Sequence, residues 1–130
     1  MRLLAVDLGD KRTGLATGDS ETGTVFPLTT LNIPIGEQLA AAIAAAAMEH
    51  AAEAIVLGLP LNMDGSEGPR AATTRAFGDT VAVATGLPIH YQDERLTSFE
   101  AEHRTRGQSP AQGTDAHAAA ILLEEYLAHP

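Results

Sequence analysis

The hydrophobic pattern at the start of the chain is that of β-strands. Leu3–Val6 is a continuous apolar run of strand length, a glycine-containing turn follows over Asp7–Arg12, and apolar residues resume at Thr13–Thr17. This order predicts a β-hairpin. A third strand is expected over Thr24–Leu31, where the internal Pro27 can be accommodated only at a sheet edge or a bulge.

The middle of the chain changes to helical spacing and then alternates between strands and helices. The apolar residues after the third strand predict a helix over Gly36–His50. Ala54–Gly58 is apolar throughout, which is typical of a central strand covered on both faces. Pro69 suits the first turn of a second helix that ends near Gly86. Phe77, Val81 and Ala84 are expected to lie on one face of that helix.

The last third of the chain contributes one more strand and two helices. The strand is expected over Ile89–Asp93, and a capping box predicts a short helix over Thr97–Gly107. A polar loop, Gln108–Gly113, precedes a final helix capped by Thr114 or Asp115. Three strands followed by alternating helices and strands predict an α/β fold with a five-stranded mixed sheet flanked by helices.

The composition fits this picture and narrows it. A length of 130 residues suits one domain, so residues 1–130 are expected to fold as a unit. Hydrophobic residues make up 45% of the chain but aromatic residues only 4%, which predicts an aliphatic, alanine-rich core. Cysteine is absent, which excludes disulfides and thiolate zinc sites. With no targeting or membrane-spanning segment in the pattern, a cytoplasmic location is expected.

The net charge of −9 argues against nucleic acid as a partner, because phosphate binding normally draws on a basic surface. However, a site for divalent cations must itself be acidic. The basic residues are also gathered near the candidate site segments, at Lys11, Arg12, Arg70, Arg75, Arg95, Arg104 and Arg106.

Three carboxylates stand at the ends of separate elements. Asp7 ends the first strand, Glu94 follows the fifth, and Asp115 opens the last helix. In a mixed sheet the first strand is naturally central, so these side chains can converge, and they repel unless a cation lies between them. Mg²⁺ or Mn²⁺ suits such oxygen ligands, and two ions about 3.5–4 Å apart can support in-line displacement at a phosphodiester. The pattern therefore indicates metal-dependent phosphodiester hydrolysis.

Each of these residues also has a simpler interpretation. Asp115 can cap a helix, and Glu94 can form a surface ion pair with Arg95. Lys11 and Arg12 can be solvated residues of an exposed turn. Asp7 is harder to explain in this way, because an acid directly after a buried apolar run has no ordinary packing role.

Four ordered segments resemble the YqgF family of pre-16S ribosomal RNA nucleases, relatives of the RuvC Holliday junction resolvase. They are Val6–Ala16, Val56–Gly65, Asp93–Ser98 and Asp115–Ala119, and together they extend over nearly the whole chain. The resemblance implies a ribonuclease H-like fold, a cytoplasmic location, dependence on divalent metal, and a role in maturing the 5′ end of small-subunit ribosomal RNA.

The resemblance also assigns roles residue by residue. The implied catalytic metal ligands are Asp7, Glu94 and Asp115, holding two Mg²⁺ or Mn²⁺ ions. The implied substrate-binding residues are Lys11, Arg12 and Arg95 at phosphates, with Asn62 and Asp64 on the rim of the cleft. The expected partners are single-stranded or precursor ribosomal RNA and ribosome-associated factors, and no membrane.

The sequence departs from the family pattern at two places. The segment Ser109–Thr114 lacks the lysines that often precede the last acid, and Ala118 stands where resolvases have a second acid. Three alternatives therefore stay open: a Holliday junction resolvase-like DNase, a sugar-kinase-like phosphotransferase, and a non-catalytic module in ribosome assembly. The chain is short for the kinase, which clamps its nucleotide between two domains.

Overall fold

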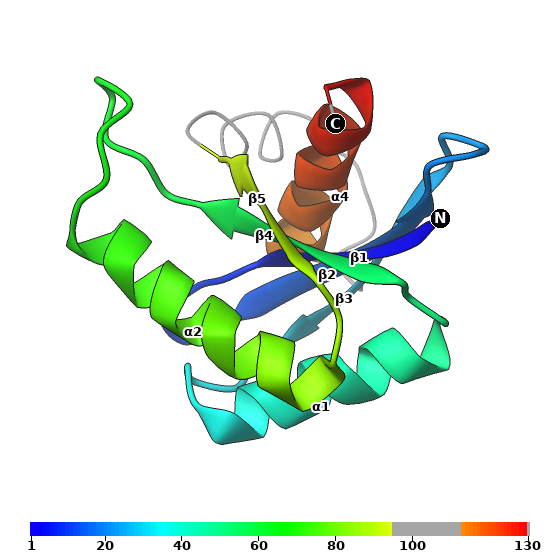
Figure 1. Ribbon diagram of the computed structural model, residues 1–130, viewed down its shortest axis with the longest axis horizontal. Helices are drawn as coiled ribbons and strands as arrows, with labels where there is room; N and C mark the ends of the chain where they lie inside the picture. The colour runs from blue at the N-terminus through cyan, green and yellow to red at the C-terminus, as the bar shows by residue number, and fades with distance from the viewer. Residues whose placement is uncertain (95–112, 130) are drawn as a thin grey trace.

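The fold is built on a five-stranded mixed sheet, seen in a computed structural model that describes residues 1–94 and 113–129 (Figure 1). The strands lie in the order β3-β2-β1-β4-β5. Their bounds are β1 Arg2–Asp7, β2 Thr13–Asp19, β3 Val25–Leu31, β4 Ala54–Leu59 and β5 Ile89–Asp93. The predicted five strands are therefore confirmed, the last with the same bounds.

The strand directions place the ends of three strands at one edge of the sheet. β1 and β2 form the predicted antiparallel hairpin, and β3 continues it antiparallel to β2. β4 runs parallel to β1, and β5 runs parallel to β4. The carboxyl ends of β1, β4 and β5 consequently meet at the same edge, where Asp7 ends β1 and Glu94 follows β5.

Helices cover both faces of the sheet. α1 (Glu37–Glu49) and α2 (Pro69–Thr85) lie on one face, and α4 (Gly113–Ala128) lies on the other (Figure 1). Successive residues of a strand point to opposite faces, so each side of β1 packs on a different layer. Leu4 and Val6 pack in the cluster under α1 and α2, whereas Leu3 and Ala5 pack against α4.

The core is aliphatic, as the composition predicts. All six residues of β4 are buried, because this strand lies between β1 and β5 with helices over both faces. The α4 side is lined largely by alanines, which allow the helix to lie close to the sheet. The larger leucine and isoleucine side chains fill the α1/α2 side, with Phe77 and Val81 of α2 among them.

The edge strand β3 accommodates Pro27 in the predicted way. Leu15 of β2 pairs with Thr29, but the next residue, Ala16, pairs with Pro27. One residue of β3, Leu28, is thus left over, which makes a β-bulge. Since β3 is also the sheet edge, both conditions expected for Pro27 are met.

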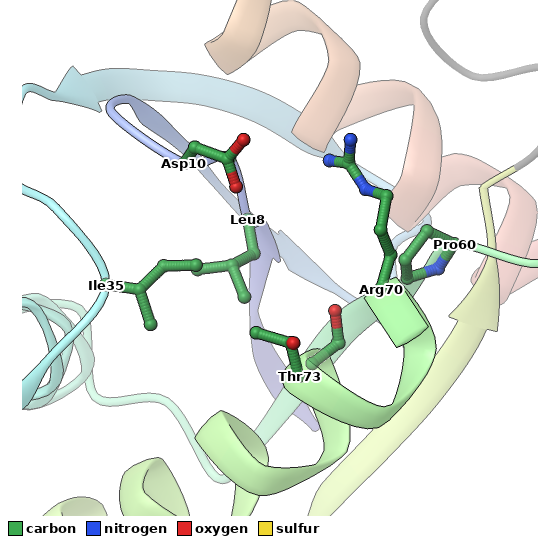
Figure 2. Close-up of a pocket in the computed structure, with 8 residues that line it drawn as sticks. Leu8, Asp10, Ile35, Pro60, Arg70 and Thr73 are labelled. Atoms are coloured by element: carbon green, nitrogen blue, oxygen red, sulfur yellow. The ribbon is translucent and has the colours of Figure 1, made fainter. Parts of the chain in front are cut away.

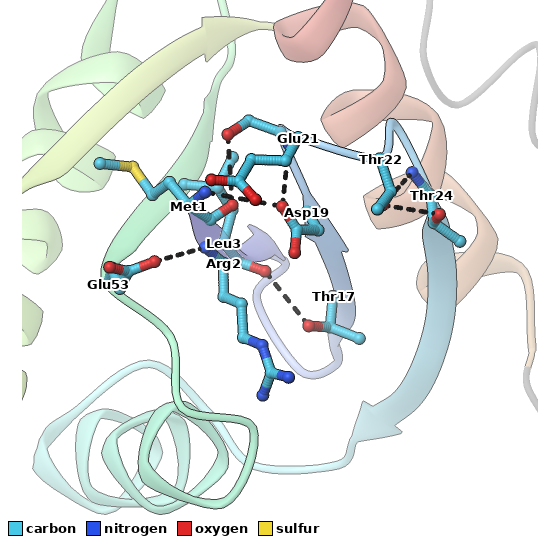
Figure 3. A network of polar contacts seen from close by, with 10 residues as sticks. Met1, Arg2, Leu3, Thr17, Asp19, Glu21, Thr22, Thr24 and Glu53 are labelled. Atoms are coloured by element: carbon cyan, nitrogen blue, oxygen red, sulfur yellow. Dashed lines mark hydrogen bonds and ion pairs between the residues drawn. The ribbon is translucent and has the colours of Figure 1, made fainter.

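The end of the sheet opposite Asp7 is held by a polar network around the start of β1 (Figure 3). The main-chain N–H of Arg2 donates to the Glu53 carboxylate at 2.7 Å. The amino group of Met1 lies 3.5 Å from Asp19, at the end of β2. These contacts fix the start of β1 to both of its neighbouring segments.

The buried residues of α2 are Ala71, Thr74, Phe77, Gly78 and Val81, whereas Ala84 is exposed. One detail differs from the prediction. α4 already begins at Gly113, so Asp115 lies in the first turn of the helix and not at its cap. The helix expected over Thr97–Gly107 and most of the following loop lie outside the described residues. Within the described ranges no helix is long and apolar enough to cross a membrane.

Candidate active site

Asp7 lies at the last position of β1, at the centre of the carboxyl edge. It pairs with Gly14 of the antiparallel β2, and β4 flanks β1 on the other side. Because Leu3 and Ala5 face α4, the alternation along β1 places the Asp7 side chain on the α4 side as well. Backbone pairing on both sides of β1 therefore fixes this carboxylate within the sheet.

Glu94 is brought to Asp7 from the neighbouring strands. Its main-chain N–H donates to the carbonyl oxygen of Leu59 at 3.3 Å, which continues the β4–β5 pairing by one residue. A side chain at Gly58 would collide with the Glu94 carboxylate, so glycine at this position leaves the room that Glu94 occupies. The Glu94 and Asp7 side chains are hydrogen-bonded to each other.

Asp115 approaches the same edge from the other layer. A Cβ atom on Gly14 would overlap the main-chain carbonyl of Asp115, so glycine allows the start of α4 to lie directly on β2. The first turn of a helix is a favourable place for a carboxylate. The Arg12 Nε lies 3.5 Å from an Asp115 carboxylate oxygen, and 29% of the Asp115 side chain is exposed.

The electrostatics of the site are those of carboxylates held together with too little positive charge. Burial, followed by the hydrogen bond with Glu94 and the charges of Glu94 and Asp115, raises the pKa of Asp7 to about 9, while Arg70 opposes the shift. Burial also raises the pKa of Glu94, although its hydrogen bond with Asp7 and the charge of Arg70 act in the opposite direction. At neutral pH the two acids therefore share one proton, with Asp7 as donor and Glu94 as acceptor.

The donor set suits a hard divalent cation. Carboxylate oxygens are the ligands that Mg²⁺ and Mn²⁺ prefer, and a cation between Asp7 and Glu94 would replace the shared proton. The described residues contain no group of three or more His, Asp or Glu side chains already arranged to hold a metal ion. Asp7 and Glu94 are in contact, whereas Asp115 acts on Asp7 through its charge and forms an ion pair with Arg12.

The five predicted substrate-binding residues are in different situations. Lys11 and Arg12 are exposed in the turn directly after Asp7. Asn62 and Asp64 lie in the loop between β4 and α2, where their side chains hold the loop itself. The Asn62 side chain donates to the Ser66 hydroxyl at 3.0 Å, and Asp64 accepts from the Ser66 main-chain N–H at 2.9 Å. Arg95 lies outside the described residues, and binding of substrate by any of the five stays a prediction.

Sequence reasoning did not assign a role to three residues that shape the site. Gly58 and Gly14 provide the space for two of the acids. A glycine inside an otherwise apolar strand is itself a signal of close approach, so Gly58 could have been found. Arg70 acts on both Asp7 and Glu94; the sequence placed it near the candidate site segments but indicated no interaction with these two acids.

Comparison with known structures identifies the class of protein that has this fold. Thermus thermophilus RuvC in complex with a Holliday junction substrate superposes with a TM-score of 0.61 at 16% identity, covering 98% of this chain and 93% of that chain. The fold is therefore ribonuclease H-like, as expected. The RuvX family model, described as Holliday junction resolvase, matches residues 1–129, and the chain belongs to this family.

Curated relatives match over almost the same length. A protein of Anaeromyxobacter sp. (strain Fw109-5) is 46% identical, covering 98% of this chain and 96% of the relative. A protein of Chloroflexus aurantiacus (strain J-10-fl) is 39% identical, covering 96% and 85%. Both bear the name "Putative pre-16S rRNA nuclease". The predicted family is confirmed, and the chain is an enzyme that hydrolyses phosphodiester bonds.

Proposed function

We propose that this enzyme is a divalent-metal-dependent nuclease of ribosomal RNA precursors, with Asp7, Glu94 and Asp115 as its metal ligands. The observation that carries the proposal is the contact between the Asp7 and Glu94 carboxyl groups at the carboxyl edge of the sheet. A pair of acids that must share a proton in the absence of a cation is poised to release it when one binds. The names of the 46% and 39% identical relatives favour RNA as the substrate.

The chain's own residues supply the positioning and the charge. Two Mg²⁺ or Mn²⁺ ions, when bound, would activate a water molecule and stabilise the leaving oxygen of the phosphodiester. Asp7 would give up the shared proton, and Glu94 would then present a second carboxylate beside it. Asp115 would join them from the first turn of α4, with Arg12 free to exchange its carboxylate partner for a substrate phosphate.

The acidic surface is compatible with nucleic acid because the positive charge is local. Lys11 and Arg12 occupy the turn after Asp7, and Arg70 lies close enough to act on both buried acids. A net charge of −9 weakens long-range attraction but does not prevent binding at such a cluster. We therefore expect weak, metal-assisted binding of single-stranded precursor RNA in the cytoplasm, together with ribosome-associated factors.

A second candidate substrate is branched DNA. The family is described as Holliday junction resolvase, and RuvC in its complex holds such a junction. The choice between RNA and branched DNA is therefore part of the test.

The test compares variants that remove one negative charge with little change in shape. Purified Asp7→Asn, Glu94→Gln and Asp115→Asn are assayed on a precursor ribosomal RNA fragment, single-stranded DNA and a four-way junction, with Mg²⁺, Mn²⁺ or EDTA. Glu125→Gln is a matched control, since Glu125 is exposed on α4, the helix that carries Asp115. We expect the first two variants to abolish cleavage, Asp115→Asn to lower it, and the control to cleave normally.

Two results would contradict the proposal. The first is cleavage by Asp7→Asn at the rate of the unmodified protein, which would show that Asp7 is not a ligand. The second is cleavage in EDTA, which would remove the metal from the reaction. Cleavage of the junction with none of the RNA would instead select the resolvase-like alternative.

A further inference from the structure

A small cavity opens between the turn that follows β1 and the start of α2 (Figure 2). Its volume is about 60 Å³. Gly9 and Asp10, in the turn after Asp7, form part of one wall. Arg70, Thr73 and Thr74, in the first turns of α2, contribute to another. A cavity of this size has room for a phosphate group.

Arg70 is a cation without a partner of its own among the described residues. It is exposed, and it forms no hydrogen bond or ion pair within the described ranges, although its charge lowers the pKa of both Asp7 and Glu94. It also stands at the positive end of α2, where Gly68 provides no side-chain cap and the first turn contains no acid. The positive end of a helix does not stabilise a guanidinium. An anion placed there would be stabilised by the helix end and also by the charge of Arg70.

Thr74 adds a buried polar group to the same cavity. Its side chain is 4% exposed, and its hydroxyl has no hydrogen bond among the described residues. The neighbouring Thr73 is different, because its hydroxyl donates to the Pro69 carbonyl at 3.1 Å. The Thr74 hydroxyl is therefore available to a ligand in the cavity.

The wall of the cavity opposite Arg70 contains Asp10, whose carboxylate would repel a bound phosphate. Figure 2 shows the Asp10 carboxylate and the Arg70 guanidinium on two sides of the opening, and no ion pair joins them. A carboxylate repels phosphate but accepts a hydrogen bond from a hydroxyl. The nucleic-acid unit that carries a phosphate and a neighbouring hydroxyl donor is the ribonucleotide, whose 2′-hydroxyl distinguishes RNA from DNA.

We propose that this cavity is a ribonucleotide subsite, in which Arg70 holds a backbone phosphate and Asp10 accepts the adjacent 2′-hydroxyl. The proposal rests on the proposed function, since it places this ribonucleotide beside the bond to be cut. It deepens that function by giving the enzyme a means of preferring RNA over DNA. Thr74 would complete the subsite from its buried end.

The test measures binding without cleavage. In an Asp7→Asn background with EDTA, the affinities for single-stranded RNA and DNA of one sequence are measured over a range of salt concentrations. Arg70→Gln, Arg70→Lys and Asp10→Asn are compared with Arg2→Gln, a matched loss of one exposed arginine at the opposite end of the sheet. Each variant is first checked for normal thermal unfolding.

The two side chains should give different signatures. Arg70→Gln should weaken RNA and DNA binding alike by about tenfold, the size of one charge-assisted hydrogen bond. It should also reduce the slope of log affinity against log salt by about 0.7, the value for one phosphate of a single strand. Arg70→Lys should keep the slope, and Arg2→Gln should keep both slope and affinity. Asp10→Asn should lower the preference for RNA over DNA several-fold without reducing the affinity for DNA.

Either of two results would overturn the subsite. One is an unchanged salt slope in Arg70→Gln, and the other is an equal change of RNA and DNA affinity in Asp10→Asn. The outcome is separable from that of the proposed function. If these binding signatures appear but Asp7→Asn still cleaves, the subsite stands and the assignment of Asp7 as a metal ligand fails.

Discussion

Replacing Asp7 with asparagine should make the metal-free protein more stable while it abolishes cleavage. The reason is that the Asp7 carboxyl group, paired with Glu94, must stay protonated in the folded protein, which lowers the free energy of unfolding at neutral pH. The folded protein raises the pKa of Asp7 to about 9 from the ordinary 3.8. Between these two values the unfolded chain releases the proton of Asp7, whereas the folded protein keeps it. The contribution of Asp7 to stability is therefore fully present below pH 3.8 and is lost progressively as the pH rises toward 9.

The size of the effect follows from the same shift. Each pH unit within this window lowers the free energy of unfolding by about 1.36 kcal/mol. At pH 7, about three units above the ordinary pKa, the upper bound is roughly 4 kcal/mol. Rearrangement of the two side chains reduces the cost, so a gain of about 1–3 kcal/mol is expected for the variant. Asparagine can also donate its amide N–H to the Glu94 carboxylate, which keeps the hydrogen bond.

Thermal and denaturant unfolding between pH 4 and pH 9, in EDTA, measure this difference. A gain of about 2 kcal/mol corresponds to a rise in Tm of roughly 6–10 °C for a domain of this length. Asp79→Asn is the control, because Asp79 is an exposed acid on α2. The stability of Asp7→Asn should exceed that of the unmodified protein more at pH 8 than at pH 5. A variant that is less stable than the unmodified protein at pH 8, or whose advantage does not grow with pH, would refute the reasoning.

Three further predictions concern the same edge of the sheet. Saturating Mn²⁺ at pH 8 should stabilise the unmodified protein by about 2–3 kcal/mol, as expected for a ligand at roughly 100 times its Kd, and Asp7→Asn should lose most of this in a thermal shift assay. Gly14→Ala should reduce both stability and cleavage, because its Cβ meets the rigid main chain of Asp115; unfolding within about 0.5 kcal/mol of the unmodified protein would contradict this. Gly58→Ala should reduce cleavage more than stability, because its Cβ meets the movable carboxylate of Glu94, and a normal rate with Mn²⁺ would show that this contact does not position the acid.

The fold was largely predictable because its signals are local. The continuous apolar run of β4 reflects burial on both faces, and the Pro27 position reflects a bulge in the edge strand of the sheet. The exposure of Ala84 could not be predicted from such a local signal. Helical spacing gives the direction in which a side chain points, but whether another element covers it depends on where the neighbouring helix ends.

The candidate site was predictable only in part. The sequence placed Asp7, Glu94 and Asp115 at the ends of elements, but for Glu94 and Asp115 an ion pair or a helix cap was the simpler explanation. Their convergence depends on β4 lying between β1 and β5, and on α4 crossing the β2–β1 side of the sheet. Neither arrangement is written in the spacing of any one segment.

The amino-acid sequence by itself determined the order and type of the described elements, the placement of Pro27 at a sheet edge or a bulge, and the aliphatic core, since these follow from periodicity and turn chemistry. Its ordered motifs also indicated the family that the comparisons confirm. Only the tertiary structure decided which charges act on one another. It joined Asp7 and Glu94 in one proton-sharing pair, gave Gly14 and Gly58 their roles as spaces for other residues, and brought Arg70 to the acids from the opposite layer. Electrostatic interactions depend on distance in space and on burial, and neither quantity is a property of position along the chain.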